Sequence, residues 1–417
     1  MLLKNVARAI PLILIAALLV TPFSMSTPAP AVAQEEVEVT LWTWTANKEA
    51  VYRDWFARYN AEVNPNVTFN INIIPRPNYD QTLAPALIGD EAPDFWEALP
   101  LGEVQEFYER GLILDLTPYI DEEWAAALYP SSLDYLTIDG RVLSMSMATN
   151  NVQVLYNMDR FEELGLEVPT TMDAFAAAMD AMEEAGYGKA TYWASANDHA
   201  QTPFFLWGQQ LFPEEFEAAD RGGEEWNRDI FREILADYRE YNDLWVEGVT
   251  AFSLDENNAL FASGDVSAYM IGNWAVPAIL SNEPDFTIGV FPVPALRADN
   301  TPAPIGSMAA TWVISSDNTD AQNEVLIDFF RWATLNGQPE LVSQVGLCPV
   351  GPPGESGLEE SNYVTRDLCE EQAGSVPRDI FDRAARDAMA AAIQGLLVGQ
   401  ADPEDVLVAA DRTRRRR

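Results

Sequence analysis

The sequence predicts an α/β protein built as two lobes, and three observations lead to this fold class. The chain has 417 residues, enough for two or three domains at about 150 residues each. Its hydrophobic fraction of 48% and its 12 tryptophans are typical of a globular core. Strand-like and helix-like patterns alternate along the whole chain, and no linker rich in Gly, Ser and Pro separates independent domains. We therefore expect two α/β lobes joined by several chain crossings.

The first 33 residues have the pattern of an export signal. Lys4 and Arg8 precede an apolar stretch over residues 10–20, which is shorter than the roughly 20 residues of a membrane span. Ala31-Val32-Ala33 is a small-x-small cleavage site, and no cysteine follows the apolar stretch to carry a lipoprotein anchor. We expect a cleaved signal peptide over residues 1–33 and a soluble periplasmic or extracellular protein. An uncleaved signal anchor is the alternative.

The first part of the mature chain alternates strands and helices. Strands are expected where apolar residues occur at every second position, and helices where they recur every three or four positions. The order is a strand over 37–44, a helix over 51–63, a strand over 67–74, a helix over 79–88, a strand over 92–96 and a helix ending near Gly111. This order predicts a parallel sheet with helices on both faces.

The remaining part shows the same alternation. Asp139-Gly140 predicts a tight turn, and Thr171 is the expected cap of a helix that Gly186 ends. Further strands are expected over 152–156, 266–271, 286–291 and 311–315, and further helices over 224–245, 321–335 and 378–397.

Charge and composition exclude several classes of function. Lys and Arg number 25 against 65 Asp and Glu, which gives a net charge of −40. Such a surface repels nucleic acid and anionic membranes. One histidine and two cysteines do not provide the ligands of a zinc ribbon or an iron–sulfur cluster. We expect no metal and no cofactor.

Motifs of catalysis are absent from the sequence. It contains no phosphate-binding P-loop, no Gly-x-Ser-x-Gly elbow and no Gly-x-Gly-x-x-Gly after a strand. A pair of carboxylates, as in glycoside hydrolases, can always be nominated among 65 acidic residues. We name no catalytic residue, and an exported carbohydrate hydrolase remains a competing class.

Aromatic and amide side chains gather at the ends of predicted strands, where open α/β sheets bind ligands. A ring face beside planar amides suits a sugar, because sugar C–H faces stack on rings and hydroxyls need both donors and acceptors. The clusters are Trp44 with Asn47, Trp96 with Glu97, Asn150 with Asn151, and Asn273 with Trp274. The alternative is that each of these tryptophans belongs to the core.

Several segments, in order, resemble the extracellular solute-binding proteins of carbohydrate ABC transporters, the family that includes maltose-binding protein. They are residues 39–42 (VTLW), 64–65 (NP), 89–94 (GDEAPD), 111–116 (GLILDL), 139–141 (DGR), 154–161 (VLYNMDRF), 169–175 (PTTMDAF), 261–274 (FASGDVSAYMIGNW) and 286–294. Two positions depart from the family pattern: Met172 stands where a tryptophan is usual, and Met158 where a basic residue is usual.

The resemblance implies a type II periplasmic-binding-protein fold with a ligand cleft between two lobes. Lobe I is then residues 34–149 and 305–345, and lobe II is residues 150–304 and 346–417. Hinge crossings are expected near Asn150, Pro304 and Gly346. The implied function is a non-enzymatic, monomeric receptor that captures a sugar or oligosaccharide and delivers it to a membrane permease. The same fold binding a polyamine or a peptide is a further alternative.

The resemblance also implies that Trp274 stacks on a sugar ring. Combined with the clusters at strand ends, it gives one set of candidate ligand-binding residues: Trp44, Asn47, Trp96, Glu97, Asn150, Asn151, His199, Gln201, Asn273, Trp274, Gly306 and Ser307.

Cys348 and Cys369 are the two cysteines of the chain, and neither belongs to a Cys-x-x-Cys motif. Export makes a disulfide between them the favoured interpretation. Closing this loop would stabilise the fold by about 3 kcal/mol through the entropy of the unfolded chain. Two separate thiols are the alternative.

Overall fold

The computed structural model describes residues 36–89, 91–195, 199–309, 311–351, 359, 361–370, 375–377 and 379–414. The chain divides into two units, residues 1–35 and residues 36–417, and only the second is described here. The predicted export signal therefore lies outside the described residues. Within them, none of the helices combines the length and the apolar character needed to cross a membrane.

The first lobe is organised by a sheet of four strands in the order β11-β3-β1-β2. β1 (Val37–Thr43), β2 (Val67–Ile73) and β3 (Phe95–Glu97) are parallel, as the β-α-β-α-β pattern predicts. β11 (Trp312–Ile314) joins from far along the chain and runs antiparallel to β3.

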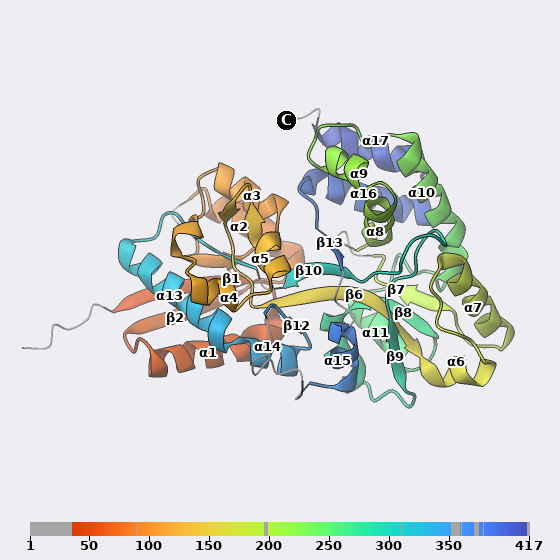
Figure 1. Ribbon diagram of the computed structural model, residues 1–417, viewed down its shortest axis with the longest axis horizontal. Coiled ribbons are helices and arrows are strands. Elements are labelled where there is room, and N and C mark those ends of the chain that lie inside the picture. Colours follow the sequence, from red (N-terminus) through yellow and green to blue (C-terminus); the bar gives the residue numbers. More distant parts are fainter. Residues whose placement is uncertain are drawn as a thin grey trace, which may run out of the picture. The chain divides into compact units, whose positions relative to one another are not determined.

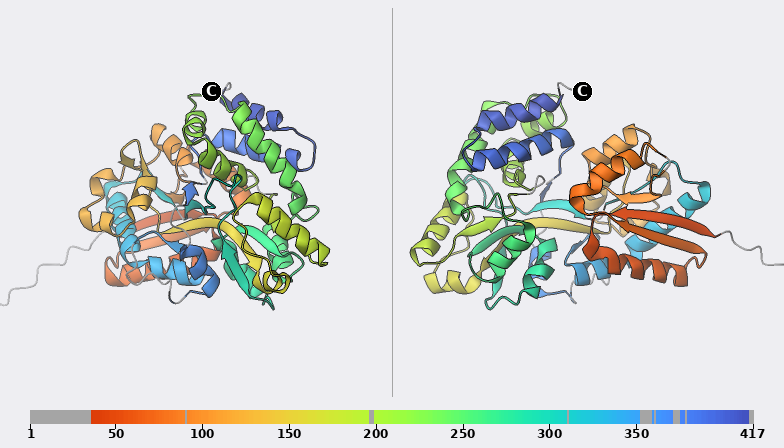
Figure 2. Two further views of the ribbon diagram at one scale, coloured as in Figure 1. Left: turned by 45° about the vertical axis from the view of Figure 1, so that its right-hand side comes forward. Right: turned by 180° about the vertical axis from the view of Figure 1, so that it is seen from behind.

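Helices cover both faces of this sheet (Figure 2). One apolar cluster joins Val39, Leu41 and Phe95 of the strands to α1 and α13, and another joins Trp96 and Val313 to α2 and α3. The helices of this lobe, with two short 3-10 turns, are η1 (Ala46–Lys48), α1 (Glu49–Glu62), α2 (Arg76–Ala86), α3 (Gly102–Glu109), η2 (Thr117–Tyr119), α4 (Glu122–Ala126), α5 (Pro130–Leu136), α13 (Asp320–Asn336) and α14 (Gln338–Val345).

A small hairpin follows α5, formed by β4 (Thr137–Ile138) and β5 (Arg141–Val142). Asp139 and Gly140 both have positive φ, 49° and 77°, which confirms the tight turn predicted there.

The second lobe is organised by a larger sheet in the order β13-β10-β6-β8-β7, in which β9 and β12 also pair with β6. Figure 1 shows β6 running through the middle of this sheet. The strands are β6 (Ala148–Asn157), β7 (Ala190–Tyr192), β8 (Ala268–Gly272), β9 (Ile288–Phe291), β10 (Ile305–Ala309), β12 (Cys348–Pro349) and β13 (Val376–Pro377).

Helices and 3-10 turns enclose this sheet in two apolar clusters, one of which includes residues of α7, α8, α10, α16 and α17. They are α6 (Met158–Leu164), α7 (Met172–Glu184), α8 (Thr202–Leu211), α9 (Pro213–Asp220), α10 (Asp229–Glu240), η3 (Tyr241–Leu244), α11 (Leu254–Ala262), η4 (Asn273–Ala275), α12 (Val276–Ser281), α15 (Tyr363–Glu370), α16 (Arg383–Leu397) and α17 (Pro403–Arg414). Thr171 caps α7 as predicted, because its side chain accepts a hydrogen bond from Ala174 N.

Three chain segments meet at the first residues of β6. Thr149 pairs with Met308 of β10 and with Cys348 of β12. The crossings predicted near Asn150, Pro304 and Gly346 therefore lie in or beside one group of paired strands. We keep the predicted lobe boundaries, residues 34–149 with 305–345 and residues 150–304 with 346–417, as a proposal.

Two predicted helices were placed too early, because side chains from elsewhere in the fold hold the preceding segment. The helix expected over residues 224–245 begins at Asp229, since the Asp411 carboxylate accepts the backbone N–H groups of Trp226 at 2.7 Å and Asn227 at 3.0 Å. The helix expected over residues 378–397 begins at Arg383, since the Asp220 carboxylate accepts the backbone N–H groups of Phe381 and Asp382, both at 3.0 Å.

Candidate functional site

Glu97, at the end of β3, is completely buried and lies at the centre of a polar cluster. Its carboxylate accepts hydrogen bonds from the hydroxyls of Thr43 at 2.6 Å, Thr45 at 2.8 Å and Tyr52 at 2.8 Å. Lys48 Nζ lies 3.5 Å from Glu97 Oε1. These contacts tie the loop after β1 to the end of β3, so in this arrangement both carboxylate oxygens are engaged by the protein.

The electrostatics of this cluster follow from its burial. Desolvation lowers the pKa of Lys48, although the neighbouring Glu97 carboxylate opposes this effect. Burial also raises the pKa of Tyr52, and the negative charge of Glu97 acts in the same direction. Tyr52 therefore remains a neutral hydrogen-bond donor at physiological pH.

The other candidates of the first lobe differ in their exposure. Trp44 is half-buried: the guanidinium of Arg76 lies 4.7 Å above its ring, and Tyr79 contacts it edge-on at 4.9 Å. Asn47 is exposed in η1. Trp96 is fully buried against Phe107, which is the core position that the sequence left open as an alternative.

The two asparagines in β6 lie on opposite faces of the strand, because successive side chains alternate. The Asn151 side chain donates to Leu368 O at 3.0 Å, and Asn273 Oδ1 accepts the backbone N–H of Asn151 at 3.3 Å. Asn273 Nδ2 lies 3.4 Å from Cys348 Sγ, which forms a disulfide with Cys369. Asn151 and Asn273 are both fully buried here, so this face joins strands β6, β8 and β12.

Asn150 and Trp274 share the other face of the sheet. In the register of the sheet, Ser307 lies opposite Asn150 and Gly272 lies opposite Val152. A side chain at Gly272 would overlap the Trp274 ring, whose nearest atom lies 1.9 Å from the position of the missing Cβ. The Cε3, Cζ3 and Cη2 atoms of the ring therefore occupy the space that a side chain at position 272 would fill. Gly272 has φ −88°, so the motif requires a glycine for close approach and not for a left-handed turn.

An aromatic row extends from Trp274. The His199 ring lies 5.4 Å from Trp274 and is stacked on Trp193 at 4.7 Å, with 29° between the planes. Trp193 directly follows β7, so the rule that ligands bind at strand ends could have identified it. The sequence analysis missed it because β7 has only three residues and gives no clear alternating pattern.

Gln201 lies just beyond this row and immediately before α8. It is only 1% exposed, yet neither its amide nitrogen nor its amide oxygen has a hydrogen-bond partner among the described residues. The same holds for Thr202 Oγ1 and for Asn150 Oδ1. Buried polar atoms are nearly always paired, so these atoms are candidates for contact with another molecule. Among the described residues, Nε1 of the core residues Trp96 and Trp226 is unpaired as well, so the criterion needs the neighbouring aromatic row beside it.

Gly306 and Ser307 lie in β10 and line a cavity of about 700 Å³. Gly306 is required for close packing, because a Cβ there would lie 2.6 Å from Ser375 Oγ. The cavity is shared with Tyr129, Tyr135 and Thr149, and it does not include Asn150, Gln201 or Trp274.

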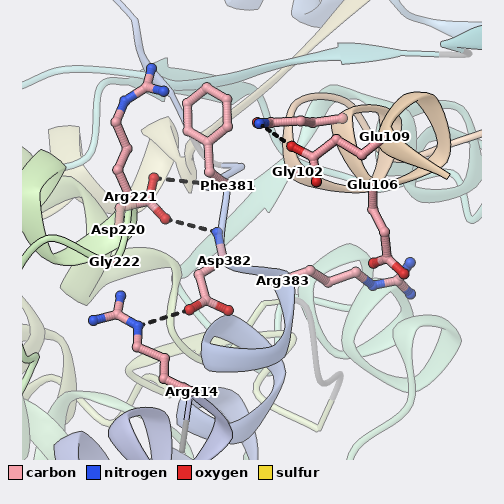
Figure 3. Close-up of a pocket in the computed structure, with 11 residues that line it drawn as sticks. Gly102, Glu106, Glu109, Asp220, Arg221, Gly222, Phe381, Asp382, Arg383 and Arg414 are labelled. Carbon is pink, nitrogen blue, oxygen red and sulfur yellow. Dashed lines mark hydrogen bonds and ion pairs between the residues drawn. The ribbon is translucent and has the colours of Figure 1, made fainter. Parts of the chain in front are cut away.

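A second cavity, of about 580 Å³, is drawn in Figure 3. It is lined by residues of α3 on one side and by residues of α9, the start of α16 and the end of α17 on the other. None of the predicted ligand-binding residues lines it. Among the described residues, no group of three or more His, Cys, Asp or Glu side chains could hold a metal ion.

A relative in sequence aligns with 57% of this chain, and a solved structure covers 91% of it. The multiple sugar-binding protein of Streptococcus mutans serotype c is 24% identical over 255 residues, which is 57% of this chain and 57% of that protein. The alignment thus spans little more than half the length of this relative.

Solved structures match over more of the chain. A chitin oligosaccharide binding protein has a TM-score of 0.79 at 20% identity, covering 91% of this chain and 98% of its own. The cyclic alpha-maltosyl-1,6-maltose binding protein from Arthrobacter globiformis has a TM-score of 0.70 at 23% identity, covering 90% and 97%. At these identities the likeness establishes the fold, which is the two-lobed α/β fold of solute-binding proteins.

The family of bacterial extracellular solute-binding proteins matches residues 54–350. Because this match covers more than half of the chain and includes strands of both sheets, the chain belongs to the bacterial extracellular solute-binding protein family.

Proposed function

We propose that this chain is the solute-binding component of an ABC transporter and that its solute is a neutral sugar or oligosaccharide. It captures the solute outside the cytoplasm by closing its two lobes and presents the closed form to a membrane permease. The chain acts as a receptor and not as an enzyme. Export by a cleaved signal peptide, the monomeric state and the permease partner are parts of the same proposal.

Three side chains of the second lobe carry the proposal. Trp274 and Asn150 share one face of the sheet, and Gln201 lies two positions after His199, whose ring contacts Trp274. Trp274 provides a flat ring held by the close approach to Gly272, and a ring of this kind stacks on the C–H face of a sugar. The Asn150 amide oxygen and both amide atoms of Gln201 have no partner among the described residues, which suits hydroxyl groups that both donate and accept hydrogen bonds.

The absence of charge on Asn150, Gln201 and Trp274 argues against a cationic ligand. The unpaired polar atoms of Asn150, Gln201 and Thr202 belong to neutral groups. The one candidate carboxylate, Glu97, is buried and already pairs with Lys48. A polyamine would require carboxylates facing the ligand. None belongs to these three side chains, whereas Asp134 and Glu370 line the separate cavity that contains Gly306 and Ser307.

Among the predicted residues, we retain Trp44, Asn47, Asn150, His199, Gln201, Trp274, Gly306 and Ser307 as candidates for ligand contact. We assign Glu97 to positioning the loop after β1, and Asn151 and Asn273 to joining the strands at the disulfide, because their polar atoms are engaged by the protein. Trp96 is assigned to the core.

A panel of ligands tests the proposal. The purified chain is incubated with neutral oligosaccharides and, separately, with polyamines and short peptides, and the melting temperature is measured. We expect a sugar to raise it, because a ligand that binds only the folded state stabilises it by about 2.7 kcal/mol at a hundredfold excess over Kd.

The same incubations are assayed for new reducing ends. Stoichiometric binding without turnover supports a receptor. Turnover of the oligosaccharide would show that the chain is a hydrolase, and stabilisation by amines or peptides alone would show that the ligand class is wrong.

A further inference from the structure

One short segment of the second lobe makes several contacts with the first lobe. Residues 379–383 follow β13 and end with Arg383, the first residue of α16, and α16 packs in the core of the second lobe through Ala385, Met389 and Ile393. The partners of this segment lie on α2, α3 and α5 of the first lobe.

Arg383 makes the strongest electrostatic contact. Its guanidinium forms ion pairs with Glu103 of α3 and with Asp80 of α2. Glu103 is only 7% exposed, and its second oxygen accepts the backbone N–H of Leu99 at 2.6 Å. A buried carboxylate that loses its cation is costly, so Glu103 favours the arrangement in which Arg383 lies beside it.

Phe381 adds a steric contact. Its backbone lies directly against Gly102, the first residue of α3: a Cβ on Gly102 would be 2.0 Å from Phe381 O and 2.6 Å from its carbonyl carbon. The Phe381 ring packs against the apolar cluster that contains Trp96 and Val104 of the first lobe. Close approach of the two lobes at this point therefore requires glycine at position 102.

Asp379 makes the third contact. Tyr135 of α5 donates its hydroxyl to Asp379 Oδ2 at 3.3 Å, and Arg386 lies 3.3 Å from Asp379 Oδ1. Both side chains of this ion pair are nearly buried, at 2% exposure for Asp379 and 5% for Arg386. The pair fixes Asp379 to α16, so the contact from Tyr135 joins α5 to the second lobe.

The contacts of Arg383 also reach the loop that carries Trp44. Asp80 is shared: one oxygen pairs with Arg383, and the other accepts from Arg76 Nη1 at 2.8 Å. The Arg76 guanidinium in turn covers the ring of Trp44. A continuous row of charges thus connects α16 of the second lobe to an aromatic candidate of the first.

We propose that residues 379–383 form an interlobe clasp that holds the two lobes together even without solute, and that breaking it shifts the chain toward an open form. The link to affinity rests on the proposed function: Gln201 and Asn150 are mostly buried when the clasp is engaged, so solute enters through the open form and is retained by the closed one. The clasp thereby sets the population of the form that retains solute.

Two variants break the clasp by independent means. Arg383→Gln removes the charge that pairs with Glu103 and Asp80, and Gly102→Ala inserts a methyl group against the Phe381 backbone. Two matched controls leave it intact. Arg331→Gln removes an arginine whose partners, Asp121 and Glu123, belong to the same lobe. Gly89→Ala adds a methyl group that meets no atom closer than 3.6 Å.

Small-angle X-ray scattering of the purified chain without solute is the first measurement. We expect a larger radius of gyration for Arg383→Gln and Gly102→Ala than for the unmodified chain and both controls. The difference for Arg383→Gln should be largest at low ionic strength, because repulsion between two acidic lobes is then unscreened. Circular dichroism verifies that each variant is folded. Equal radii of gyration for all folded variants would overturn the clasp.

Affinity for a bound solute is the second measurement. If breaking the clasp lowers the fraction of closed molecules from about one half to about one twentieth, the apparent Kd for the solute rises roughly tenfold. If a variant has the larger radius of gyration but binds the solute with unchanged affinity, the proposed link between the clasp and retention of the solute is refuted. Opening in a chain that binds no sugar at all would refute the proposed function and leave the clasp itself supported.

Discussion

Glu97 of the first lobe and Gln201 of the second were both predicted as ligand contacts, and the structure gives them opposite surroundings. Both side chains are buried, at 0% and 1% exposure. Glu97 accepts hydrogen bonds from three hydroxyls and pairs with Lys48, whereas the Gln201 amide has no partner among the described residues. Glu97 thus belongs to a buried cluster in which the protein itself satisfies its hydrogen bonds, whereas the Gln201 amide has a donor and an acceptor that no described residue satisfies.

This difference shows why a sequence motif cannot by itself identify a binding residue. A polar residue next to a tryptophan at a strand end is compatible with ligand binding and with a buried cluster that fixes a loop. The two outcomes are separated by the hydrogen-bond partners, which come from distant parts of the chain: Thr43, Thr45 and Tyr52 reach Glu97 across about 50 positions of sequence.

The largest expected effect is on stability, from replacing Glu97. Glu97→Ala removes the acceptor for the buried hydroxyls of Thr43 and Tyr52 and the half-buried hydroxyl of Thr45, and it leaves the buried Lys48 ammonium without this carboxylate. Breaking a buried pair in this way costs about 3–5 kcal/mol of unfolding free energy. Urea denaturation followed by circular dichroism measures it. A stable variant with strongly reduced sugar affinity would instead place Glu97 among the ligand contacts.

Asp220 is a second buried carboxylate, and two backbone N–H groups donate to it. Burial has a larger influence on its pKa than the positive charge of Arg221, its neighbour in sequence. Asp220 accepts the N–H groups of Phe381 and Asp382, both at 3.0 Å, and desolvation by burial raises its pKa to about 6. The folded state therefore binds a proton more tightly than the unfolded state, whose aspartate pKa is about 3.9.

The sign of the pH dependence follows from these two pKa values. Between about pH 4 and pH 6 the folded chain holds more protons at Asp220 than the unfolded chain, so this group lowers stability as pH rises, by about 3 kcal/mol in total. Asp220→Asn should remove that part of the slope in urea denaturation at stepped pH. The exposed Asp54→Asn is the control and should leave the slope unchanged. An identical slope in the Asp220 variant would contradict the prediction.

Trp274→Ala distinguishes ligand contact from core packing. If the ring stacks on a sugar, affinity falls by about 2 kcal/mol, or roughly thirtyfold. If it serves mainly as core, unfolding free energy falls by about 3–5 kcal/mol while affinity of the surviving fold hardly changes. Melting and affinity are measured on the same sample. Trp226 is fully buried, so Trp226→Ala is the control for a purely structural tryptophan. If Trp274→Ala changes stability and affinity in the same way as Trp226→Ala, Trp274 is removed from the site.

The sequence was sufficient for features that depend on local pattern. The parallel order of β1, β2 and β3, the turn at Asp139 and the cap at Thr171 were all predicted correctly, because each depends on periodicity or on one residue's local conformational preference. The start of α10 was predicted incorrectly because Asp411, almost two hundred positions away, holds Trp226 and Asn227 outside the helix.

The candidate site was predictable only in part, for the same reason. The Gly272-Asn273-Trp274 motif and Asn150 could be read from sequence, but the division of Asn150 and Asn151 between opposite faces needs the register of β6. Trp193 follows a strand too short to recognise. The role of Arg383 could not be predicted from the sequence, because it depends on contacts with Glu103 and Asp80, which lie about three hundred positions earlier.

Replacing Gln201 is expected to have the smallest effect. It discriminates best, because one substitution should raise the stability of the chain and lower its affinity for the sugar. Gln201→Met replaces an unpaired buried amide with an apolar side chain of similar size. Leaving a buried donor and acceptor unsatisfied costs about 1–3 kcal/mol, so removing them should raise the unfolding free energy by about 1 kcal/mol in the absence of solute. Affinity for the sugar should fall by about tenfold, since one good hydrogen bond is worth about 1 kcal/mol or slightly more.

Gln209 is the matched control, because it lies on α8, the helix that Gln201 precedes, and its amide is paired. Its Nε2 donates to Phe205 O at 3.2 Å and to Pro377 O at 2.7 Å. Gln209→Met should therefore lower the unfolding free energy and leave affinity nearly unchanged, the reverse of the Gln201 variant. Differential scanning calorimetry and titration calorimetry on both variants measure the two quantities. If Gln201→Met destabilises the chain as Gln209→Met does, the Gln201 amide serves the fold as Glu97 does, and the contrast between the two lobes disappears.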